Sequence, residues 1–220
     1  MCKRCVALVI LGASLACLGA GADLLPYVPS WTPPDLDAVR TRLDGLSWSD
    51  FVETSYRLYL QRFPEAITRM GMAADLGVRD DRLNDYSDAY VRETMEIESE
   101  ILARLRAYDR SALSLSDQTV YDACAWYWDD LVRAHPFLYC DYPVSHLFVT
   151  SADQLTQELL LEIHPLSSAA DAENYVLRLE QLGAQLDGII DALDRRATAG
   201  VVVPQRSLAW ALPGVRQLAA

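Results

Sequence analysis

The chain has 220 residues, of which 51% are apolar and 23% are charged. That composition is typical of globular proteins and excludes disordered and fibrous classes. Its 19 basic and 31 acidic residues give a formal net charge of −12. Nucleic acids and anionic membrane surfaces bind clustered lysines and arginines, so this charge argues against both kinds of partner.

The first 22 residues have the pattern of a secretory signal peptide. Lys3 and Arg4 give a positively charged start, residues 6–18 form an apolar run, and Ala20-Gly21-Ala22 offers a cleavage site between small residues. A membrane anchor is the alternative, but a span takes about 20 apolar residues and this run is shorter. We therefore expect an exported protein, periplasmic or extracellular, with no membrane span after the signal is removed.

The number of cysteines in the mature protein depends on cleavage of the signal peptide. Lipid anchoring through Cys17 is a minor alternative, because Ser14 stands where such sites usually carry an aliphatic residue. Signal removal leaves Cys124 and Cys140 in an oxidising compartment. These two cysteines could form a disulfide, or they could remain two separate buried thiols. We favour separate thiols, since Cys124 falls within an expected helix and disulfide geometry is demanding.

The rest of the chain divides into two parts. Residues 23–46 are expected to form a proline-rich lead-in and a first short helix, near residues 35–43. Residues 47–220 are expected to form a helical domain that is incomplete at its C-terminus. The tail after Pro204 is expected to form no terminal element, because Pro213 breaks its apolar pattern.

Apolar periodicity predicts an all-α fold, an irregular array of six to eight helices. Residues 71–86, which hold two glycines and many polar residues, are interpreted as loop. After the first short helix, we expect helices over residues 49–63, 87–108, 116–134, 151–163 and 168–197, with a short turn over 64–70.

Serines supply the expected helix starts. The predicted N-caps are Ser49, Ser87, Ser116, Ser151 and Ser168. Leu115 and Val120 are expected to pack as a hydrophobic staple around Ser116, and Gln154 and Asp171 to complete capping boxes with Ser151 and Ser168.

The strongest periodic signal lies in the last of these helices. A coiled coil is one interpretation, but the run is short and lacks a clear charge pattern beside the seam, so we favour packing against a core. The apolar residues that recur every three or four positions are Tyr175, Leu179, Leu182, Leu186, Ile189 and Leu193.

The sequence has three histidines, and none belongs to a His-Glu-x-x-His zinc motif. His135 and His164 each precede a proline at an expected helix end, where a capping or turn role is favoured over metal binding. His146 follows Tyr142-Pro143 in a loop, and a role in a pocket is the alternative for it.

Two further segments invite a functional interpretation. The acidic loop over residues 80–88 suggests calcium, but its spacing does not match a calcium loop, so we favour a solvated loop that leads into a helix cap. Aromatic residues near the middle of the chain could line a groove or be buried in a helix. The candidate cleft or binding surface consists of Trp126, Trp128, Tyr139, Tyr142 and His146.

Several short motifs follow one another in order over about residues 45–205. They are Phe63–Thr68, Met70-Gly71, Asp80–Leu83, Asp85–Ser87, Tyr142-Pro143, Ile163–Pro165, Asp171–Tyr175, Arg178-Leu179, Ala199–Val201 and Pro204. In order and spacing this set resembles the N-terminal part of the bacterial family catalogued as domain of unknown function 885.

The resemblance implies a secreted or lipid-anchored, mostly helical protein similar to zinc metallopeptidases. Full-length relatives carry a His-Glu-x-x-His motif in the C-terminal half, and they are expected to bind zinc and a peptide substrate. The family-motif residues of this chain are expected to be structural. They are Pro64, Asp81, Arg82, Tyr86, Ser87, His164, Pro165, Gly200 and Pro204.

This chain departs from the family by ending at Ala220 without the zinc motif. We therefore expect the N-terminal helical region of a metallopeptidase-like protein, without a cofactor of its own and inactive alone. Its partner would be the missing C-terminal half, against which it would form one wall of a cleft. The alternative is a self-sufficient exported helical module that binds a peptide or protein through the aromatic segment 126–142.

Overall fold

The computed structural model describes residues 30–144 and 151–218. Within these ranges the chain forms helices joined by turns and loops, with no strand, which confirms the expected irregular all-α array. The expected signal peptide and His146 lie outside the described residues. The α-helices are α2 (Leu36–Arg42), α3 (Trp48–Leu60), α4 (Pro64–Met70), α5 (Ala73–Leu76), α6 (Asp88–Leu105), α7 (Leu115–Ala134), α8 (Ala152–Glu158), α9 (Ala169–Thr198) and α10 (Gln205–Leu218).

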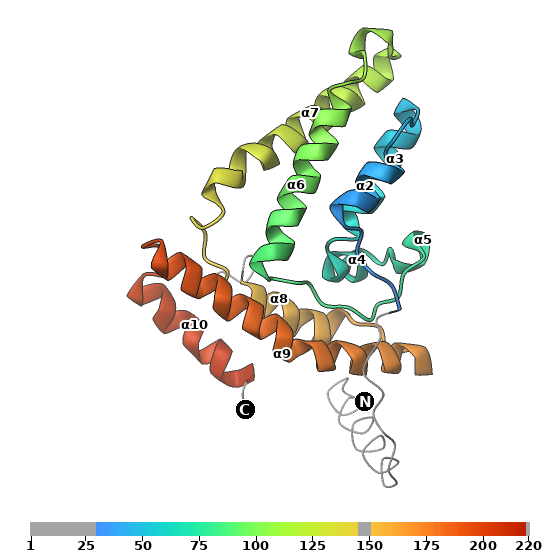
Figure 1. Ribbon diagram of the computed structural model, residues 1–220. Coiled ribbons are helices and arrows are strands. Elements are labelled where there is room, and N and C mark those ends of the chain that lie inside the picture. Colours follow the sequence, from blue (N-terminus) through green and yellow to red (C-terminus); the bar gives the residue numbers. More distant parts are fainter. Residues whose placement is uncertain (1–29, 145–150, 219–220) are drawn as a thin grey trace.

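The helices form two groups (Figure 1). Helices α2, α3, α6 and α7 stand together, and α6 and α7 are joined through a 3-10 turn over Arg110–Ala112. The long helix α9 crosses the lower end of this group, with α8 and α10 beside it. A π-helical turn, Leu159–Ile163, extends α8. No helix of the described residues is long and apolar enough to cross a membrane.

The core lies inside the first group of helices. Its buried apolar side chains come from α2, α3, α6 and α7, which explains why these four helices pack together. The cluster consists of Val39, Leu43, Phe51, Leu58, Ile97, Ile101, Leu102, Leu105 and Trp128.

Two expected N-caps were misplaced by two residues. Helix α3 is capped by Ser47, whose hydroxyl accepts from the N–H of Asp50, and α7 is capped by Ser114 in the same way. The expected staple around Ser116 is therefore wrong, and Leu115 is 83% exposed. Each true cap has an aspartate three residues later that can accept from the serine hydroxyl, a signal that Ser49 and Ser116 lack.

Of the other three predicted N-caps, two are confirmed and one makes no cap hydrogen bond. Ser87 caps α6, and Ser168 with Asp171 forms the expected capping box of α9. Ser151 does stand at the N-cap of α8, but its side chain makes no cap hydrogen bond there, so the second capping box is wrong.

Three helices were not expected from the sequence, and the first is α4, which replaces the expected short turn over residues 64–70. Helix α5 has only four residues, and Gly71 and Gly77 on its two sides adopt left-handed conformations that end α4 and α5. Helix α10 forms although Pro213 lies inside it. Proline removes one backbone donor and disfavours the interior of a helix, but here the helix continues through it.

The buried face of α9 is largely polar, which corrects the expectation of an apolar stripe packed in a core. Tyr175 and Ile189 are buried as expected, but Leu186 is exposed. The other buried positions of α9 are Asn174, Arg178, Gln185 and Arg196.

This polar face binds the loop that connects α5 to α6. Arg178 donates from Nε to the carbonyl of residue 82 (2.9 Å), Gln181 donates to that of residue 81 (2.7 Å), and Gln185 donates to that of residue 84 (3.1 Å). The Gln181 side chain also accepts from the N–H of Leu83 (3.2 Å). Because these three residues are spaced by three and four, they lie on one helix face and follow the loop backbone.

Gly188 continues the same face, and it allows α9 to approach the loop closely. A Cβ at this position would lie 3.3 Å from the backbone of both Tyr86 and Ser87, tighter than ordinary van der Waals contact. Gly183, on the same helix, has open space where a Cβ would be. The fold therefore needs the absence of a side chain at Gly188, but not at Gly183.

His164 anchors the other end of the polar face. Its Nδ1 accepts from a guanidinium nitrogen of Arg178 (2.7 Å), and its Nε2 lies 3.0 Å from the carbonyl of Asp171, which places the ring proton on Nε2. Arg178 also donates to Thr68 of α4. Burial is the largest effect on the pKa of His164 and lowers it; the hydrogen bond to the Asp171 carbonyl opposes burial, and the Arg178 charge lowers the pKa further.

The acidic loop is not the solvated segment that the sequence indicated. Asp81 is fully buried, and its carboxylate accepts from Ser30 (2.6 Å) and from the Trp31 indole (3.1 Å). Asp80 accepts from Thr68 (2.6 Å). These carboxylates are bound by donors of the protein, so the loop is a packed part of the fold.

We predict that the two α9 glycines respond oppositely to alanine. Gly183→Ala should raise the free energy of unfolding by about 0.5–1 kcal/mol, because alanine favours the helix and nothing opposes the new methyl group. Gly188→Ala should be at least about 1 kcal/mol less stable than Gly183→Ala, because the methyl group meets the loop backbone. Urea unfolding of both variants measures this, and equal gains in stability would contradict a close approach at Gly188.

The lowered pKa of His164 predicts a pH dependence of stability. Below about pH 6.5 the unfolded chain binds a proton that folded His164 resists, so its contribution to stability is present at pH 7.5 and is lost as the pH falls. His164→Asn keeps an acceptor for Arg178 and does not titrate. Urea unfolding between pH 7.5 and 5 should show a shallower loss for the variant, by up to about 1.4 kcal/mol per pH unit. The same slope in both proteins would contradict the assignment.

Candidate functional site

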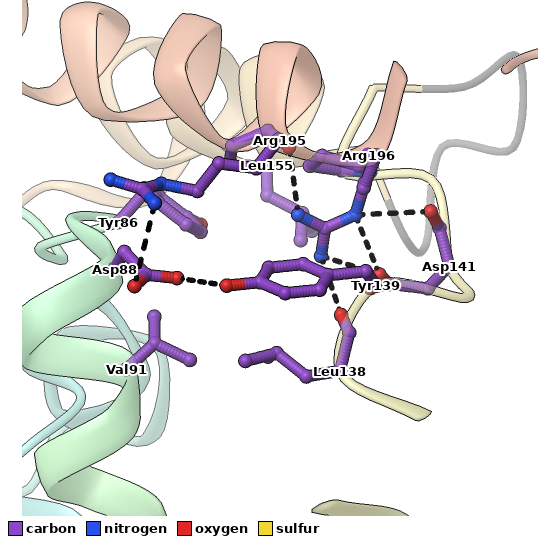
Figure 2. A pocket seen from close by; sticks show the side chains of 11 residues that line it. Tyr86, Asp88, Val91, Leu138, Tyr139, Asp141, Leu155, Arg195 and Arg196 are labelled. Carbon is purple, nitrogen blue, oxygen red and sulfur yellow. Dashed lines mark hydrogen bonds and ion pairs between the residues drawn. The ribbon is translucent and has the colours of Figure 1, made fainter. Parts of the chain in front are cut away.

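The first candidate site is a cavity of about 250 Å³, which we call the Tyr139 cavity. It lies where the start of α6, the segment after α7 and the C-terminal end of α9 meet (Figure 2). Its wall consists of Tyr86, Asp88, Val91, Leu138, Tyr139, Asp141, Pro143, Leu155, Ala192, Arg195 and Arg196.

Tyr139 and Asp88 form the polar side of this cavity. The Tyr139 hydroxyl donates to Asp88 (2.5 Å), and Arg92 contacts both groups, donating to Asp88 (2.8 Å) and to the Tyr139 oxygen (2.6 Å). The Tyr139 hydrogen bond, followed by that of Arg92, holds the pKa of Asp88 below its usual range. Asp88 therefore stays ionised at neutral pH and is unsuited to act as a general acid.

The two arginines of α9 have different roles in the cavity. Arg196 is fixed by the Asp141 carboxylate (2.5 Å) and by the carbonyls of Leu138 and Ala192, both at 3.0 Å. Arg195 is half exposed, and its ion pair with Asp88 is long, at 3.8 Å. Arg195 is thus the cation of this cavity that can turn to an anionic ligand, so the arrangement suits binding more than proton transfer.

A second cavity of about 300 Å³, the Glu98 cavity, adjoins the first, and Tyr86 and Val91 line both. Glu98 is buried, and its two oxygens face the Tyr59 hydroxyl (2.8 Å) and His135 Nε2 (2.7 Å). Burial, with the Glu98 charge, raises the pKa of the Tyr59 phenol. One signal for this site is present in the sequence, because Glu98 interrupts the apolar face of α6.

Of the five residues expected to form one binding surface, the structure separates the two tryptophans. Trp126 is 71% exposed on α7, whereas Trp128 is 5% exposed and belongs to the core. Residues two apart on a helix point about 200° away from each other, so these two tryptophans cannot share a surface. Tyr139 lines a cavity, Tyr142 is partly exposed, and His146 lies outside the described residues.

Most family-motif residues surround the polar face of α9 or mark helix ends. Asp81, Arg82 and His164 belong to the network around the loop, and Tyr86 lines both cavities. The others mark boundaries: Pro64 begins α4, Ser87 caps α6, Pro165 follows the turn after α8, Gly200 ends α9 with a left-handed conformation, and Pro204 precedes α10.

The residues that the structure describes do not fit the zinc ion implied by the family resemblance. No three His, Cys, Asp or Glu side chains among them gather as a metal site. Both ring nitrogens of His164 have protein partners, and His135 is bound to Glu98. Cys124 and Cys140 are separate free thiols, as favoured from the sequence, although Cys140 is exposed rather than buried.

Comparison with known proteins places the chain in a family without giving it an activity. Neither the curated proteins nor the solved structures yielded a match. A family model described as "Bacterial protein of unknown function (DUF885)" matches residues 64–220. Because this is more than half of the chain, and because it agrees with the resemblance in the ordered motifs, the chain belongs to the DUF885 family.

Proposed function

We propose that these helices are the non-catalytic scaffold of an exported, zinc-metallopeptidase-like protein. In this proposal they form one wall of a substrate cleft and do not hydrolyse peptides themselves. The zinc ligands and the general base belong to a catalytic region that packs against this wall. A peptide is the proposed substrate of the assembled protein.

Apolar side chains left exposed on α9 and α10 carry this proposal. Ile190 on α9 is 55% exposed and Leu186, one turn before it, is also exposed. On α10, Leu208 is 43% exposed and Leu212, one turn after it, is 38% exposed, whereas Trp210, 57% exposed, lies on the opposite side of the helix. Residues four apart share a helix face, so each helix presents an apolar strip to its surroundings. A further region of the protein that covered these strips would gain the free energy of burying them.

The alternative function is an exported helical module that binds a peptide or protein through the aromatic segment over residues 126–142. Trp126, Tyr127 and Phe137 are exposed at 71%, 45% and 64% and favour it. Trp128, expected to contribute to such a surface, is in the core and does not.

The test is to measure where the exposed apolar surface lies. We expect the purified chain to bind a dye that fluoresces on apolar surface, and Ile190→Gln with Leu208→Gln to reduce that signal by at least about half. Trp126→Ala with Phe137→Ala is the corresponding change in the segment over residues 126–142 and should reduce it less. We also expect no peptide hydrolysis by the chain alone, whether zinc is removed or restored.

Two results would contradict the scaffold. A cooperative monomer that binds no dye would have no apolar face for a catalytic region to cover. A dye signal that disappears with the Trp126 and Phe137 changes and survives the α9 and α10 changes would favour the binding module.

A further inference from the structure

The Glu98 cavity contains a buried carboxylate that no lysine or arginine of the described chain pairs with. Glu98 is 7% exposed, and no lysine or arginine in the described ranges lies within ion-pair distance of it. Its hydrogen-bond partners are a phenol, Tyr59, and an imidazole, His135. A buried charge is costly unless it is paired, and each carboxylate oxygen can accept more than one hydrogen bond. The two carboxylate oxygens of Glu98 can therefore accept hydrogen bonds from further donors.

The one cation that lines the cavity is already engaged. Arg62 is 2% exposed and forms an ion pair with Glu93 (2.9 Å). Its remaining nitrogens donate to the Thr94 hydroxyl (3.1 Å) and to the Tyr90 carbonyl (2.9 Å). The Arg62–Glu93 pair is neutral, so Arg62 has no charge to spare for Glu98.

The second negative group is Asp85, which also lines the cavity. It is exposed, and one of its oxygens accepts from the N–H of Ser87 (2.8 Å). The cavity thus holds one exposed and one buried carboxylate, an arrangement that attracts cations and disfavours anions.

The remaining wall is aromatic. Tyr59 and Phe63 pack edge to face with their centroids 5.0 Å apart, and Tyr86 lines the cavity beside them. Tyr90 also lines it, although Arg62 covers one of its faces at 3.5 Å. Aromatic faces attract organic cations and also contact an apolar alkyl chain.

We infer that the Glu98 cavity is a binding site for an organic cation, the alkylammonium or alkylguanidinium group of a ligand. The charged group would donate to Glu98, and the alkyl chain would lie against Tyr59, Phe63 and Tyr86. Under the function proposed above, on which this last step rests, the cation is the basic side chain or the amino terminus of a peptide.

The test is isothermal titration of the purified chain with butylguanidinium and with butylurea, a neutral molecule of the same shape. The cation should bind and the urea should bind at least about tenfold more weakly, because only the cation forms charged hydrogen bonds to Glu98. Acetyl-lysinamide and alaninamide then distinguish a side-chain ammonium from a terminal one. Binding of either through Glu98 supports the site.

Three variants test the residues. Glu98→Gln should weaken butylguanidinium binding at least about tenfold. Asp85→Asn removes an exposed charge without disturbing the core and should weaken it about two- to threefold. Glu180→Gln, an exposed glutamate of α9 outside the cavity, is the matched control and should change nothing.

His135→Gln separates loss of the charge from loss of the fold. It keeps a neutral donor for Glu98 and should retain butylguanidinium binding within about twofold. Equal binding of butylurea, unchanged binding by Glu98→Gln, or no binding of the cation to the native chain would each overturn the site. The measurement needs no zinc and no hydrolysis, so its failure would leave the scaffold proposal standing.

Discussion

The arrangement of this protein depends on a polar helix face that binds the backbone of a loop. Arg178, Gln181 and Gln185 donate to three carbonyls of residues 81–84, and Gly188 lets the same face meet residues 86 and 87. Buried backbone groups outside regular structure must find partners, and here side chains of α9 supply them. The loop is therefore as much a part of the packed interior as the helices that it joins.

That constraint positions both cavities. The loop delivers Tyr86 to their shared wall and Ser87 to the N-cap of α6, after which Asp88 and Val91 follow in fixed places on the first turn. Gln185 also donates to the buried Glu65 of α4 (2.6 Å), which ties the loop to a third element. A change in the face of α9 would consequently be felt at sites that α9 itself does not line. The cation site proposed around Glu98 depends on this support through Tyr86.

Local patterns in the sequence were sufficient for the fold class and for most helices. Apolar periodicity and side-chain caps are properties of neighbouring residues, so α2, which Asp35 caps, and the serine-capped α6 and α9 could be predicted with their starts. The polar face of α9 could not, because its partners lie about a hundred residues earlier in the chain. From the sequence alone, Gln181 and Gln185 suggest a solvent-exposed helix face, because the loop that they bind is distant in the chain. The sequence pattern showed Glu98 as an exception on an apolar helix face, but only the structure shows the cavity around it.

The most direct test is native-state hydrogen exchange at the amides of Leu83 and Asn84. Their N–H groups donate to the side chains of Gln181 (3.2 Å) and Glu65 (3.1 Å), although no helix contains them. Protection close to that of the core amides of α6 is the result that the account predicts. Exchange as fast as at the exposed turn over residues 44–46 would show that the loop opens freely, and would contradict the claim that α9 holds it.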